Sequence, residues 1–133
     1  MQEMRVFSQA KGLRTYVLEV TEKSPKKYRG SFTNKLRALC FEIVENLYLA
    51  NEVYLKNKKT VDRNYQRRRT YQNVVLAKLK TVAYLAEIAS NAQAILPKEY
   101  AKIANMTTDC IHLTGGWIAG DQRMVEQLFG AGP

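Results

Sequence analysis

Apolar residues recur every three or four positions along most of this chain, which is the spacing of one face of an α-helix. The clearest stripe is formed by Leu36, Leu39, Cys40, Ile43, Val44 and Leu47. A second such stripe comprises Val75, Leu79, Val82, Ala86 and Ala89, and a third comprises Ile103, Met106, Cys110, Leu113 and Trp117. No alternating apolar run is long enough to predict a β-sheet. The pattern therefore predicts an all-α protein.

Helix-breaking residues divide the chain into four predicted helices. They run from about Arg5 to Lys23, from Ser31 or Thr33 to about Leu55, from about Val61 to Ala94, and onward from Pro97. Proline at a first helical position and Ser or Thr at a cap are typical of helix starts, so Ser31, Thr33 and Thr60 are candidate caps. The connections are short, which predicts an antiparallel up-down four-helix bundle over residues 1–121 and a short, loose tail over 122–133.

The two longest predicted helices carry a second apolar row. These rows contain Val74, Leu85 and Ile88 on one helix and Ala104, Ile111 and Ile118 on the other. Helices that are apolar on more than one face often bury two faces, which favours a homo-oligomer. A single wide core stripe explains the same residues equally well.

Length and composition limit the class of protein. The 133 residues suffice for one domain, and 46% apolar residues is ordinary for a globular chain. No apolar stretch is long enough to span a membrane, and the N-terminus lacks the basic start and apolar run of a secretory signal. A cytoplasmic location is expected.

The net charge of +9 is unevenly distributed. Residues 21–80 contain fifteen Lys/Arg and five Asp/Glu, a net charge of +10, whereas residues 81–133 have a net charge of −2. Such an excess of basic residues is typical of proteins that bind polyanions, and we expect nucleic acid as the partner. A basic amphipathic helix could also bind anionic lipid, but the arginines have no neighbouring face of Trp, Phe or Leu, so no membrane partner is expected. Merely solvated helix surfaces are the plainer alternative.

Two clusters account for most of the excess. The first contains Lys26, Lys27, Arg29, Lys35 and Arg37, with Lys23 and Tyr28 beside them. The second contains Lys56, Lys58, Lys59, Arg63, Arg67, Arg68 and Arg69, with the single acid Asp62. Side chains four residues apart lie along one side of a helix, so Lys59, Arg63 and Arg67 form a ladder of like charge that a polyanion would neutralise. Tyr65 and Tyr71 could stack on exposed bases. These twelve basic residues are the candidate nucleic-acid-binding residues.

Candidate catalytic and metal sites are missing from the sequence. His112 is the single histidine, and Glu42 and Glu45 share a helix face without the Glu-x-x-His motif of a di-iron bundle. Cys40 and Cys110 lie within apolar stripes, where free cysteine behaves as a small hydrophobe. We therefore expect no enzyme activity, no cofactor and no metal.

Three segments together resemble the Avd-type proteins, the accessory variability determinants of diversity-generating retroelements. They are Ser24-Pro25-Lys26-Lys27-Tyr28-Arg29, the Leu36/Leu39/Ile43/Leu47 stripe, and Leu113-Thr114-Gly115-Gly116-Trp117-Ile118. The resemblance covers about residues 5–120. It implies a homopentamer of four-helix protomers that associates with a reverse transcriptase and its template RNA, or an RNA–DNA hybrid, during mutagenic copying.

The resemblance carries over no catalytic residue. It places Lys26, Lys27 and Arg29 in a basic turn, and the Gly115-Gly116 pair would let another helix approach closely, within the protomer or between protomers. The chain departs from the family in its Arg67-Arg68-Arg69 region and after Asp121. Two other readings remain open, namely a related bundle protein of ribosomal-RNA intervening sequences and a basic protein-interaction scaffold.

Overall fold

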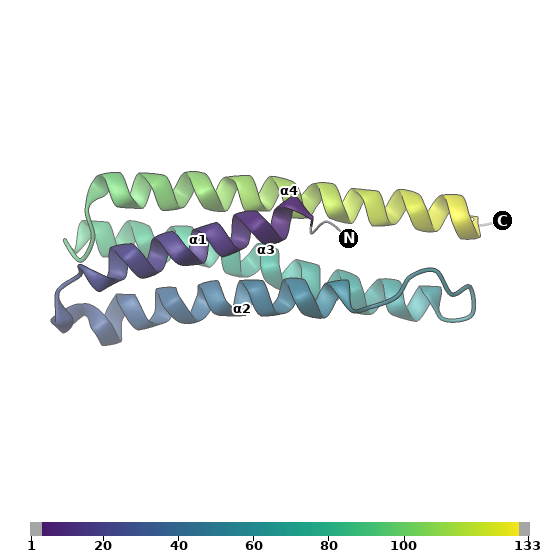
Figure 1. Ribbon diagram of the computed structural model, residues 1–133, viewed down its shortest axis with the longest axis horizontal. Coiled ribbons are helices and arrows are strands. Elements are labelled where there is room, and N and C mark those ends of the chain that lie inside the picture. The colour runs from purple at the N-terminus through teal and green to yellow at the C-terminus, as the bar shows by residue number, and fades with distance from the viewer. Residues whose placement is uncertain (1–3, 131–133) are drawn as a thin grey trace.

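The computed structural model describes residues 4–130, and all regular structure in that range is helical (Figure 1). The four long helices are α1 (Arg5–Glu22), α2 (Asn34–Asn51), α3 (Val61–Asn91) and α4 (Pro97–Phe129). This confirms the predicted helical class and the number of helices, with starts at Arg5, Val61 and Pro97 where the sequence placed them.

The helices pack against one another in a closed order. α2 contacts α1 and α3, α3 contacts α4, and α4 contacts α1. Figure 1 shows the α1–α2 and α3–α4 connections at one end of the elongated molecule and the α2–α3 connection toward the other end.

The core lies along the predicted stripes of α2 and α3. The α3 residues Val75, Leu79, Val82, Ala86 and Ala89 are completely buried, and Leu36, Cys40, Ile43 and Leu47 of α2 are buried against them. Steps of three and four residues keep these positions on one face, so the sequence pattern and the core coincide here.

The buried side of α4 is more polar than predicted. It includes Thr107, Thr114 and Asp121, whereas Met106, Leu113 and Trp117 are half-buried beside it. A threonine can be buried in a helix when its hydroxyl donates to a carbonyl of the preceding turn. Thr114 Oγ1 donates to the Cys110 carbonyl at 2.7 Å, and Thr107 Oγ1 donates to the Ala104 carbonyl at 2.8 Å.

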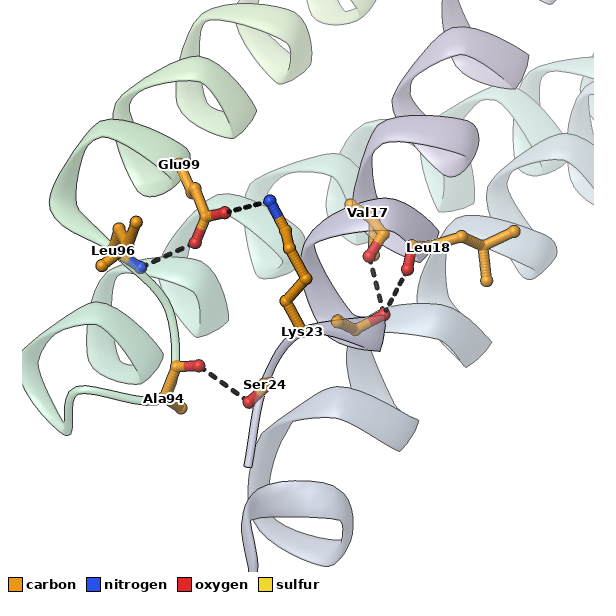
Figure 2. Close-up of polar contacts among 8 residues, drawn as sticks. Val17, Leu18, Lys23, Ser24, Ala94, Leu96 and Glu99 are labelled. Carbon is orange, nitrogen blue, oxygen red and sulfur yellow. Dashed lines mark hydrogen bonds and ion pairs between the residues drawn. The ribbon is translucent and has the colours of Figure 1, made fainter. Parts of the chain in front are cut away.

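Hydrogen bonds connect the two turns at one end of the molecule (Figure 2). Ser24 Oγ donates to the Ala94 carbonyl at 2.7 Å. The buried Glu99 carboxylate accepts the Leu96 backbone N–H at 2.8 Å and pairs with Lys23 Nζ at 3.3 Å. The bond to Leu96 satisfies a backbone donor at the start of α4, which is the role of an acid in the first helical turn.

The entry to α2 differs from the prediction. The chain turns through one 3₁₀ turn (Lys26–Tyr28) and one π-helical turn (Arg29–Thr33) that runs directly into α2. Thr33 therefore has helical backbone angles and makes no capping hydrogen bond, because the backbone before α2 is already helical. Thr60 precedes α3 as predicted, but its side chain accepts a bond from Asn64 instead of capping the helix.

α4 extends past the predicted boundary at residue 121. Residues 122–129 continue the helix, because neither glycine nor proline occurs in this segment before Gly130. Phe7 near the start of α1 contacts Trp117, with ring centroids 6.1 Å apart. Figure 1 accordingly shows the last turns of α4 continuing beyond the N-terminal end of α1. Of the remaining predicted tail, residues 131–133 lie outside the described residues.

The second apolar rows belong mainly to the core edge. Leu85 and Ile118 are buried, and Ile88 and Ile111 pack against the core while half-buried. This favours the wide core stripe over a second buried face for these residues. Nothing lies within 4 Å of the place where a Cβ would stand at Gly115 or Gly116, so no helix of the described chain uses this pair for a close approach.

Candidate nucleic-acid interface

The two basic clusters lie at opposite ends of α2. The turn cluster (Lys26, Lys27, Arg29, Lys35 and Arg37) surrounds the α1–α2 connection, and the loop cluster (Lys56, Lys58, Lys59, Arg63, Arg67, Arg68 and Arg69) covers the α2–α3 connection and the first turns of α3. α2 has 18 residues, which corresponds to a length of about 27 Å. The basic segment of the sequence is therefore divided between two places, the α1–α2 connection and the α2–α3 connection, which lie toward opposite ends of the molecule (Figure 1).

Most of the loop cluster is exposed. Lys56, Lys58, Lys59, Arg63 and Arg67 all have exposed side chains. Within residues 4–130, none of the five forms an ion pair, although Asp62 lies next to Arg63 in sequence. Their charges are therefore available to an external anion.

Arg68 differs from its neighbours because its guanidinium is bound within the protein. Nε and Nη2 donate to the two oxygens of Asp121 at 2.9 and 2.8 Å, and Nη1 donates to the Val53 carbonyl at 3.1 Å. Its side chain is 14% exposed, and the guanidinium lies 4.9 Å from the centre of the Trp117 ring. With all three nitrogens bonded, Arg68 holds α3, α4 and the α2–α3 connection together. We therefore remove it from the candidate nucleic-acid contacts.

Arg69 is half-buried and also differs from the exposed members. Its Nη1 is buried and has no hydrogen-bond partner among the described residues. A buried donor without a hydrogen-bond partner costs folding free energy and is rare in proteins. The exposed Arg63 and Arg67 have no such buried, unpaired nitrogen.

One aromatic residue near the loop cluster escaped the sequence analysis. Tyr54 is 63% exposed, whereas Tyr65 and Tyr71 are half-buried. Tyr54 lies two residues before Lys56, where an exposed ring can stack on an unpaired base. Tyr28 of the turn region has a structural role instead, since its hydroxyl donates to the Ala92 carbonyl at 2.9 Å.

The turn cluster includes a hollow of about 610 Å³ between the end of α1 and the start of α2. Lys26, Arg29 and Arg37 line it, together with Thr21 and Glu22 of α1. Arg37 Nε donates to Thr21 Oγ1 at 2.7 Å. Lys27 and Lys35 are exposed outside the hollow, and Lys27 Nζ lies 5.1 Å from the centre of the Tyr28 ring.

The residues considered for chemistry occupy ordinary structural positions. His112 is exposed on α4, and Glu42 pairs with Lys78 at 3.1 Å. Burial raises the pKa of the Cys40 thiol to about 12 and that of Cys110 to about 11. Among residues 4–130, no three His, Cys, Asp or Glu side chains gather closely enough to hold a metal ion. Within the same range, no helix has the length and apolar character needed to cross a membrane.

Comparison with known protein families, curated proteins and solved structures finds no match to this chain. The resemblance to Avd-type proteins consequently remains a prediction from its short motifs.

Proposed function

We propose that the protein is a non-catalytic nucleic-acid-binding subunit, whose exposed cations contact the phosphate backbone and position the strand without reading bases. The observation that carries this proposal is the loop cluster. Five exposed cations gather there without an ion pair among the described residues. Like charges so close together repel, and a polyanion is the partner that relieves this repulsion.

The proposal extends to the assembly in which the subunit acts. The closed order of helix contacts and the short connections support an antiparallel up-down bundle. On the resemblance, we infer a cytoplasmic homopentamer that associates with a reverse transcriptase and holds its template RNA, or the RNA–DNA hybrid, during mutagenic retrohoming. A bundle protein that binds ribosomal RNA would use the same surface, and a reverse transcriptase gene beside this one would favour the retroelement role.

A second candidate function, a protein-interaction scaffold, is supported by an apolar groove between α1 and α2. The groove has a volume of about 660 Å³. Phe41 and Leu49, which line it, are 52% and 41% exposed. Exposed apolar residues gathered in one groove are typical of protein contacts. The groove is also compatible with a nucleic-acid-binding subunit that docks on a protein partner.

The test is the affinity of the purified protein for a labelled structured RNA across a salt series. In the Arg63→Gln/Arg67→Gln variant, affinity should fall at every RNA sequence. The slope of log affinity against log salt should decrease by about 1.4 to 1.8, because each phosphate contact contributes roughly 0.7 to 0.9. Both side chains are exposed and unpaired among the described residues, so the variant should unfold at the same temperature as the wild-type protein.

The matched control is the Lys80→Gln/Lys98→Gln variant. It removes the same net charge from two exposed positions outside both clusters. Its salt slope should stay close to that of the wild type. Equal slopes for the two variants would mean that net charge, and not the loop cluster, determines binding. An absence of RNA binding at low salt, with tight binding to an acidic protein, would favour the scaffold.

A further inference from the structure

We propose that the hollow at the α1–α2 turn binds one phosphate group of a nucleic-acid strand, with Arg37 as its central ligand. This inference rests on the proposed function, because it assigns a defined phosphate site to the turn cluster. It differs from the proposal for the loop cluster, where exposed cations contact phosphates without a hollow.

The position of Arg37 is set by a buried neighbour. Thr21 is only 5% exposed, and its hydroxyl donates to the Val17 carbonyl at 2.7 Å. The same oxygen accepts the Arg37 Nε–H at 2.7 Å, which orients the plane of the guanidinium. Nη1 and Nη2 of Arg37 have no hydrogen-bond partner among residues 4–130, so the two-pronged end of the guanidinium remains available to an anion.

Two more cations line the same hollow. Lys26 and Arg29 come from the 3₁₀ and π-helical turns, and both are exposed. Glu22 is the one acid that lines it, and no ion pair links Glu22 to these cations within the described residues. The lining therefore carries three positive charges and one negative charge, which favours an anionic ligand.

The arrangement fits phosphate better than carboxylate. A carboxylate offers two oxygens in one plane, which the fork of a single arginine can satisfy. A phosphate group has further oxygens that point away from that plane. Lys26 and Arg29, which approach from the turns between α1 and α2, can bind those oxygens while Arg37 binds the others. Lys27 and Lys35 lie outside the hollow, where they can contact neighbouring phosphates of the same strand.

The backbone around the hollow is already ordered. Ser24 Oγ and Tyr28 Oη donate to the carbonyls of Ala94 and Ala92 at 2.7 and 2.9 Å, which ties the turn to the neighbouring α3–α4 connection. A site that needs no ordering upon binding retains more of its interaction energy as affinity. Short π-helical turns are also frequent at functional sites.

The experiment measures binding of a 3′-labelled single-stranded RNA at fixed salt. Arg37→Gln should weaken binding about tenfold, the effect of losing one charge-assisted bidentate contact. Arg37→Lys keeps the positive charge but loses the bidentate geometry of the guanidinium. The decrease in log affinity for Arg37→Lys should therefore be more than half of the decrease for Arg37→Gln. Glu22→Gln should tighten binding about twofold by removing an opposing charge. This gain cannot result from misfolding. Lys80→Gln is the control and should bind within twofold of the wild type.

Two RNA probes identify the source of the phosphate. If the Arg37 effect appears with a 5′-hydroxyl strand, the group is an internal phosphodiester. If it appears only with a 5′-phosphorylated strand, the group is a terminal phosphate. Either result supports the site. Binding by both Arg37 variants within twofold of the wild type would overturn it, while a reduced salt slope of the Arg63/Arg67 variant would leave the proposed function standing.

A separate titration with inorganic phosphate tests the hollow if the wild-type protein binds no RNA. The Nε–Hε resonance of Arg37, assigned by comparison with Arg37→Lys, should shift more with phosphate than with sodium chloride of equal ionic strength. Equal shifts would overturn the site, irrespective of any result with RNA.

Discussion

Replacement of Arg68 by Met should destabilise the protein strongly, although Arg68 lies among surface arginines in the sequence. The change removes two charge-assisted bonds to Asp121, at 2.9 and 2.8 Å, and a third bond to the Val53 carbonyl at 3.1 Å. Asp121 keeps one bond from Gln72 Nε2 at 2.9 Å, and its side chain is only 7% exposed. The carboxylate would therefore remain buried with its charge unpaired.

The expected loss follows from that burial. Removing one partner of a buried ion pair costs about 3–5 kcal/mol, because the other charge stays out of water. The Arg68 side chain is 14% exposed, so water partly screens this side of the pair. We therefore expect a loss in the lower half of that range, about 3–4 kcal/mol. For a chain of this size, such a loss corresponds to a melting temperature lower by about 10–15 °C.

The assay is urea denaturation of a double-mutant cycle. The variants are Arg68→Met, Asp121→Leu and the two combined, with the exposed Arg67→Met as the matched control. We expect the double variant to lose less stability than the sum of the single variants, because it leaves no unpaired charge. The difference should be about 2–3 kcal/mol. Arg67→Met should change the free energy of unfolding by less than about 0.5 kcal/mol.

Two results would refute this reasoning. A coupling below about 0.5 kcal/mol would show that Arg68 and Asp121 contribute independently. An Arg68→Met variant that keeps its stability but loses RNA affinity would return Arg68 to the set of nucleic-acid contacts.

Four further predictions concern stability and thiol chemistry. Gly116→Ala should stabilise the protein by about 1 kcal/mol in urea denaturation, since the added methyl meets no atom within 4 Å. Gln93→Gly should raise the free energy of unfolding by about 0.5–1 kcal/mol in the same assay. Gln93 has a φ of 66°, a left-handed conformation that glycine adopts without strain. Because burial raises the pKa of Cys40 to about 12, a thiol reagent at pH 8 should leave it unmodified until denaturant is added. Ionisation of this thiol in the unfolded chain should lower stability as pH rises above its ordinary pKa of 9.0, and Cys40→Ala should reduce that decline.

Apolar periodicity predicted the helices and most of the core. The stripe on α3 is buried as expected, and so are Leu36, Cys40, Ile43 and Leu47 of the stripe on α2, whereas Leu39 and Val44 are half-buried at the edge of the core. On α4 the prediction missed Thr107, Thr114 and Asp121. A pattern of apolar letters cannot find polar residues whose bonds are satisfied inside the protein, since their burial depends on partners elsewhere in the chain.

The candidate site was predictable in composition but not in layout. Lys26, Arg29 and Arg37 belong to one predicted cluster, but the apolar pattern does not predict the 3₁₀ and π-helical turns that place them around one hollow. Thr21, which orients Arg37, was missed. One signal was available for it, because Thr21 follows Val17 by four residues on the apolar face of α1. In the same way, Asp121 follows Trp117 by four residues, which places it on the same side of α4 as that ring.

The separation of the two clusters determines the shortest nucleic acid that can occupy both. α2 is about 27 Å long. An RNA duplex or RNA–DNA hybrid, both of which are A-form, must therefore be at least about 27 Å long to reach from one cluster to the other. Shorter ligands bind one cluster at a time, whereas longer ligands gain from a high effective concentration at the second cluster. Affinity should consequently rise in a step, not gradually, as the ligand passes this length.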